Sequence, residues 1–221
     1  MNARTENIDR YWRYALWLAL FTIFYNLAEG LVSVYFGAQD GALTLLGFGV
    51  DSFIEVLSGA GILAMVLRIS RDTDGLRSRF ERTALRMTGS SFYLLATGLA
   101  ATAAYNLFSA HKPATTIPGL IISLVSIAIM WALVLGKRKA GRALHSAPIL
   151  ADANCTLVCI YMSLVLLASS FIYQVTGFGF ADSLGALGLI YFSVREGMEV
   201  FEKAAGLECG CEDNTCEVNH E

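Results

Sequence analysis

Two carboxylic acids stand in the middle of a long apolar stretch, Ala42 to Leu67, and they are the residues best suited to chemistry in this chain. Asp51 and Glu55 are one helical turn apart, so in a helix both side chains lie on the same face. A central acid opposes membrane insertion of a helix by about 2.5 to 3.5 kcal/mol. Two such acids therefore predict a functional site, and the less favoured alternative is that a proton or an interior partner neutralises each one.

A second cluster combines a carboxylate with two thiols in the stretch PILADANCTLVCIYMSLVLL. Asp152, Cys155 and Cys159 fall on one helical face. For either cysteine alone, packing in the interior is the simpler explanation, since cysteine is a common buried residue. Two thiols one turn apart below a carboxylate favour a ligand set instead. We expect Asp152 to support the ligands or to belong to a proton path, with capping of the helix N-terminus as the alternative.

The end of the sequence, GLECGCEDNTCEVNHE, carries a third group of potential ligands: Cys209, Cys211, Cys216 and His220. A disulfide is not expected in the cytoplasm, so these residues form a candidate soft-metal site. Such a site would capture ions and pass them to the site inside the membrane. Their spacing matches no standard zinc finger, and a disordered acidic tail is the alternative.

Composition places these clusters in a membrane protein, because 55% of the 221 residues are hydrophobic, 16% are charged, and the mean hydropathy is +0.54. We predict an all-α fold with six transmembrane helices in one transport domain, residues 1–206, followed by a tail, 207–221. The segment KRKAGR is expected to be a loop, and the net charge of -3 gives no sign of nucleic-acid binding. The predicted spans are 11–37, 42–69, 83–109, 117–136, 148–176 and 181–201.

The basic residues support the same topology independently of hydropathy. Of the 16 lysines and arginines, all but Lys112 lie before or at the start of the first span, between or beside the second and third, between the fourth and fifth, or near the end of the sixth. Lysine and arginine accumulate on the cytoplasmic side, so both termini are predicted to be cytoplasmic. At 1.5 Å per residue, Glu55 and Cys159 lie at nearly the same depth. Asp51 would lie one turn further out and Cys155 one turn further in, so a single ion touching all four requires helix tilt or a shifted boundary.

Two local patterns resemble the cation diffusion facilitator family. EGLVSVYFGAQDGALTLLGFGVDSFIEVLSG is similar to the family's first and second spans, and LADANCTLVCIYMS is similar to its fifth. The resemblance covers residues 11–203. It implies a divalent-metal exporter that exchanges its cargo for protons, usually as a homodimer. Carried over by position, it places the cation on Asp51, Glu55, Cys155 and Cys159.

The sequence departs from that family's usual pattern in two respects. The fifth span normally supplies a histidine and an aspartate, where this sequence has Cys155 and Cys159. The usual cytoplasmic domain after the sixth span is also missing, so a short member of the family is expected. Thiolates favour zinc and softer ions such as cadmium, whereas manganese prefers oxygen ligands.

We therefore predict a transporter, and not an enzyme, that exports zinc or cadmium across the plasma membrane by proton antiport and needs no cofactor. One alternative is a membrane metal sensor or buffer that binds the same ions without transport. Another is a carrier of a non-metal solute in which the acids relay protons and the cysteines are idle. In the first span, Asn26 and Glu29 either line the cation path or form an interhelical hydrogen bond with an arginine or a serine.

Overall fold

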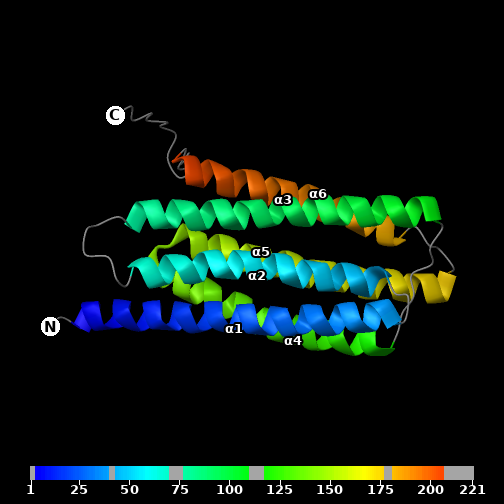
Figure 1. The fold of residues 1–221 in the computed structure, drawn as a ribbon, viewed down its shortest axis with the longest axis horizontal. Coiled ribbons are helices and arrows are strands. Elements are labelled where there is room, and N and C mark those ends of the chain that lie inside the picture. The colour runs from blue at the N-terminus through cyan, green and yellow to red at the C-terminus, as the bar shows by residue number, and fades with distance from the viewer. Residues whose placement is uncertain (1–2, 40–42, 70–76, 110–116, 177–180, 207–221) are drawn as a thin grey trace.

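A computed structural model describes residues 3–39, 43–69, 77–109, 117–176 and 181–206, which form an antiparallel bundle of long helices (Figure 1). No strand occurs in these ranges, so the predicted all-α fold is confirmed there. The first described residues and the end of the last helix lie at the same end of the bundle (Figure 1). The helices are α1 (Ala3–Gln39), α2 (Leu43–Ile69), α3 (Arg77–Ser109), α4 (Ile117–Leu144), α5 (Ala147–Thr176) and α6 (Ala181–Ala205).

Helix α5 occupies the centre of this arrangement, because it contacts α2, α3, α4 and α6. In the most apolar stretch of α5, 67% of the residues are buried inside the bundle, whereas the figure for the most apolar stretch of α1 is 33%. Helix α1 packs mainly on α2, and α3 packs mainly on α6. The helix that carries the cysteines is therefore surrounded by protein, and α2 with its two acids is one of its direct neighbours.

The outer surface of the bundle is suited to lipid. Helices α1, α2, α4 and α5 each contain a segment long and apolar enough to cross a membrane. Large apolar side chains such as Trp17 and Phe24 are about 70% exposed on the outside, where lipid tails can cover them. Within the described residues no such segment is found in α3 or α6, and α6 carries Arg195, Glu196 and Glu199 in its last three turns.

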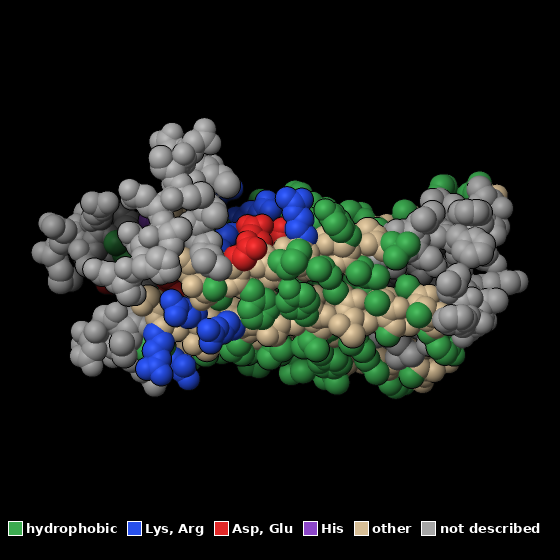
Figure 2. Space-filling view, turned by 90° about the horizontal axis from the view of Figure 1, so that it is seen from above, with side chains coloured by type: hydrophobic (Ala, Val, Ile, Leu, Met, Phe, Trp, Pro, Cys, Tyr) green, Lys and Arg blue, Asp and Glu red, His purple; other side chains and the backbone are tan. Residues whose placement is uncertain are grey.

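Basic side chains mark one end of the bundle. Helices α2, α4 and α6 each have a basic residue in the last turn, namely Arg68, Arg142 and Lys203. In Figure 2 the lysine and arginine side chains gather toward one end of the face shown, and hydrophobic side chains cover much of its remaining length. The basic side chains thus gather on one side, as their placement in alternate loops of the sequence predicts.

The fourth helix differs from the prediction, because KRKAGR is not a loop. Helix α4 continues past Gly136 to Leu144, and Lys137 and Ala140 are buried within the bundle. The helix ends at Leu144. The next residue, His145, is exposed and has a positive φ of 48°, and the Ser146 N–H donates to the Gly141 carbonyl oxygen at 2.9 Å. Hydropathy falls at Lys137, but the helix persists because its face toward α5 is still packed.

Glycine allows α1 and α2 to approach closely beside the acids. A Cβ atom at Gly49 would lie 2.8 Å from Val34 Cγ2 and 3.0 Å from the Gly30 carbonyl oxygen. The second contact is with backbone, which cannot rotate away. Residue 49 must therefore lack a side chain for α1 and α2 to keep their present separation.

We expect Gly49→Ala to lower stability by about 1 to 3 kcal/mol, since overpacking at a rigid contact forces the two backbones apart. The readout is the midpoint of thermal unfolding of the purified protein in detergent. Gly47→Ala is the matched control, because no atom lies within 4 Å of a Cβ built there. Equal midpoints for the two variants would contradict this account of the α1–α2 contact.

Candidate functional site

The four predicted ligands come from two neighbouring helices and are all enclosed by protein. Asp51 and Glu55 lie on α2, and Cys155 and Cys159 lie on α5. Each of the four side chains is at most 2% exposed. Both cysteines are free thiols. The bundle therefore removes two acids and two thiols from water and lipid together.

The acid pair and the thiol pair face each other across the α2–α5 contact. Glu55 interacts electrostatically with Cys155, and Asp51 does so with Cys159. Cys159 also interacts with Glu55. The packing of the two helices thus brings all four groups into electrostatic range of one another, although the sequence left a one-turn offset between them.

Several oxygen atoms in this cluster have no ordinary hydrogen bond. Asp51 Oδ1, Asp51 Oδ2 and Glu55 Oε2 are buried and have no hydrogen bond of ordinary geometry among the described residues, although the Cys159 thiol interacts with both carboxyls. Leaving a buried polar atom without a partner costs free energy. Such atoms can be satisfied by a cation or by a proton, and two carboxyls with two thiols are a donor set that fits a four-coordinate divalent ion.

The cluster is not closed around an ion in this arrangement. Within the described ranges, no three histidine, cysteine, aspartate or glutamate side chains stand in metal-binding geometry. Glu55 Oε1 instead accepts a hydrogen bond from Thr156 Oγ1, and Cys159 Sγ donates to the Cys155 carbonyl oxygen at 3.4 Å. Glu55 Oε1 would have to leave Thr156, and the Cys159 thiol would have to lose the proton that it donates, before either atom could bind an ion.

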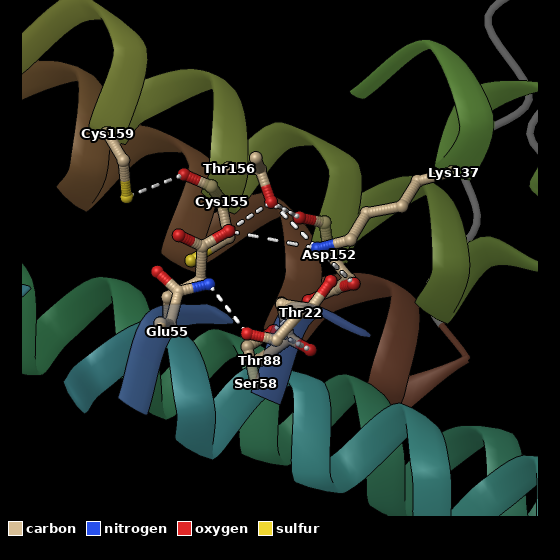
Figure 3. A network of polar contacts seen from close by, with 10 residues as sticks. Thr22, Glu55, Ser58, Thr88, Lys137, Asp152, Cys155, Thr156 and Cys159 are labelled. Atoms are coloured by element: carbon tan, nitrogen blue, oxygen red, sulfur yellow. Dashed lines mark hydrogen bonds and ion pairs between the residues drawn. The ribbon is translucent and has the colours of Figure 1, made fainter. Parts of the chain in front are cut away.

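A lysine that the sequence analysis assigned to a loop lies beside this cluster (Figure 3). Lys137 is 2% exposed and enters the bundle from α4. Its Nζ donates to Thr156 Oγ1 at 2.7 Å and forms ion pairs with Asp152 Oδ2 at 2.8 Å and Glu55 Oε1 at 3.7 Å. Asp152 could have predicted the burial of Lys137 from sequence. It lies near the start of α5, at the end of the bundle where α4 ends, and an acid inside a membrane bundle is usually paired with a cation.

Asp152 is fixed from both sides. Its Oδ2 pairs with Lys137, and its Oδ1 accepts a hydrogen bond from Ser58 Oγ at 2.7 Å. Ser58 Oγ in turn lies 3.0 Å from Thr88 Oγ1 on α3. Asp152 stands in the second turn of α5, so it is not the residue that caps the helix. These partners link α2, α3, α4 and α5 through one carboxylate.

The polar residues of α1 form a separate group next to the acids. Glu29 is 7% exposed and accepts hydrogen bonds from Tyr25 Oη at 2.8 Å and from Ser52 Oγ of α2 at 3.0 Å. The Glu29 carboxyl also interacts electrostatically with Asp51 and with Glu55. Glu29 thus forms an interhelical hydrogen bond with a serine, which was one of the two expected roles. Asn26 Nδ2 instead donates within α1 to the Thr22 carbonyl oxygen at 2.9 Å. A role of either residue in a cation path stays a prediction.

The tail candidates lie outside the residues that the structure describes. Cys209, Cys211, Cys216 and His220 therefore remain a prediction from their spacing alone.

The fold and the buried cluster together define a multi-pass membrane protein with an ionisable site inside its helix bundle. Residues 16–206 match the family model of the cation efflux transmembrane domain. This match covers most of the chain, which therefore belongs to the cation efflux family, also called cation diffusion facilitators. No curated protein matches the chain. Membership makes the protein a transporter of metal cations rather than a catalytic enzyme.

Proposed function

We propose that the protein exports zinc or cadmium from the cytoplasm across the plasma membrane in exchange for protons, and that it does so as a homodimer. The observation that supports this most is the juxtaposition of two buried thiols with two buried carboxyls, of which both Asp51 oxygens and one Glu55 oxygen lack hydrogen-bond donors among the described residues. Family membership supports cation efflux in general. The choice of ion and of coupling rests on the chemistry of the ligands.

The thiols carry the argument for a borderline-soft ion. Zinc binds thiolate sulfur at about 2.3 Å and accepts carboxylate oxygen in the same tetrahedral site. Magnesium, calcium and manganese prefer sites made only of oxygen. A site built from Cys155, Cys159, Asp51 and Glu55 should therefore rank cadmium and zinc above manganese.

Proton coupling follows from the same ligands. Thiols and carboxyls must lose their protons to bind an ion, so metal binding releases protons and acidification releases metal. If the buried cluster opens alternately to each side of the membrane, an ion loaded from the cytoplasm is displaced by protons from the other side. The basic end of the bundle supports placing the helix ends at Arg68, Arg142 and Lys203 in the cytoplasm.

Flux through proteoliposomes tests the proposal. We expect vesicles with a trapped zinc-sensitive dye to take up zinc when the lumen is more acidic than the bath, and to stop when a protonophore collapses the gradient. Protein-free vesicles are the control. A metal sensor or buffer would bind zinc without such uptake, and uptake that ignores the proton gradient would contradict antiport.

A further inference from the structure

We infer that Lys137 is a built-in counter-cation of the transport site: it competes with the metal ion for Glu55, and Asp152 holds it in place when the ion binds. This inference rests on the proposed function, because it takes Glu55 as a ligand of the transported ion. It adds a residue that neither the local sequence patterns nor the proposed ligand set includes.

The distances around Lys137 distinguish its two acidic partners. The ammonium lies 2.8 Å from Asp152 Oδ2 but 3.7 Å from Glu55 Oε1. Asp152 is additionally anchored by Ser58, whereas the second oxygen of Glu55 has no hydrogen-bond donor among the described residues. Asp152 is thus the firm partner of the lysine, and Glu55 is the partner that can be released.

Thr156 connects the lysine to the releasable acid. Its hydroxyl oxygen accepts a hydrogen bond from Lys137 Nζ at 2.7 Å, and its hydroxyl proton is donated to Glu55 Oε1. If Glu55 turns toward an incoming ion, Lys137 keeps its contacts with Asp152 and Thr156. The buried ammonium then keeps an acidic partner both before and after the ion arrives.

Charge balance gives this arrangement a consequence for the cargo. With the carboxyls ionised, Asp51, Glu55 and Asp152 together with Lys137 carry a formal charge of -2, and each thiol that loses its proton to the ion adds one further negative charge. In a low-dielectric interior, an ammonium next to the site also repels the entering cation. Lys137 should therefore weaken metal binding and make the bound ion easier to release.

The test uses two substitutions that should move zinc affinity in opposite directions. Lys137→Met removes the competitor and should tighten zinc binding about tenfold. Asp152→Asn leaves the ammonium with Glu55 as its acidic partner and should weaken binding about tenfold. Zinc affinity of the purified protein in detergent is measured at one fixed pH by competition with a chelating dye. Lys139→Met, at an exposed position on the same helix, is the matched control and should bind as the wild type does.

The double variant, Lys137→Met with Asp152→Asn, separates competition from direct action of Asp152 on the ion. If Asp152 acts by holding the lysine, removing the lysine as well should restore affinity to the wild-type value or better. An affinity as weak as that of Asp152→Asn alone would overturn the inference. The double variant removes both members of the ion pair, so it avoids a lone buried charge that could prevent folding.

Size-exclusion chromatography establishes which variants are folded. If Lys137→Met aggregates, Asp152→Asn and the double variant still decide, since unchanged or tighter binding by Asp152→Asn overturns the inference. Loss of affinity in both single variants would mean a purely structural role and would also overturn it. If the wild type binds no zinc, or Asp51→Asn binds as the wild type does, the proposed function fails instead.

Discussion

Asp51→Asn is expected to abolish proton-coupled zinc uptake in proteoliposomes, with a loss of more than about a hundredfold. Substituting residues that only support metal ligands typically costs 10- to 100-fold, and a charged ligand at the centre of the site should cost more. Asp51 is 2% exposed, and both of its carboxylate oxygens lack a hydrogen-bond donor within the described part of the chain. The amide preserves the shape of the side chain but removes the negative charge and one acceptor oxygen. Initial rates of zinc uptake are the measurement.

Glu199→Gln provides the matched control for this experiment. It makes the same change from acid to amide on α6, where Glu199 is about half exposed and pairs with Lys203 one turn away. An exposed pair of this kind contributes little to stability. We expect uptake to stay at the wild-type rate, so a normal rate in Asp51→Asn would contradict the assignment of this carboxyl to the cation.

Replacing both cysteines, Cys155→Ser with Cys159→Ser, is expected to change which metal the protein prefers. Serine keeps a small polar group at each position but offers a hard, neutral oxygen in place of a thiolate. Cadmium affinity should fall by more than about a hundredfold, and manganese affinity should change much less. Both are measured by dye competition on the purified variant.

The comparison of the two metals in one variant serves as its own control, because misfolding would weaken binding of both alike. The result also tests the alternative in which Asp51 and Glu55 relay protons for a different solute. That alternative leaves the cysteines idle and predicts that the double variant transports as the wild type does. Equal losses for cadmium and manganese in a double variant that is folded by size-exclusion chromatography would instead show that the thiols do not select the ion.

Much of the candidate site was accessible from local sequence pattern. Helical periodicity alone places Asp51 and Glu55 on one face, and it does the same for Cys155 and Cys159. Apolar length and the alternation of basic residues predicted the number of helices. These properties are local, because they depend only on the period of the helix and on how each residue partitions between water and lipid.

The sequence by itself determined the helices, their order and the faces that carry acids and thiols. Only the tertiary structure decided that these faces meet, that α4 continues beyond Gly136, and that Lys137 is buried. Hydropathy did not predict this, because a hydropathy scale treats each lysine as an unpaired charge. Burying an unpaired charge costs free energy. Asp152, Glu55 and Thr156, contributed by neighbouring helices, together offset that cost, and no pattern within α4 can show that they are there.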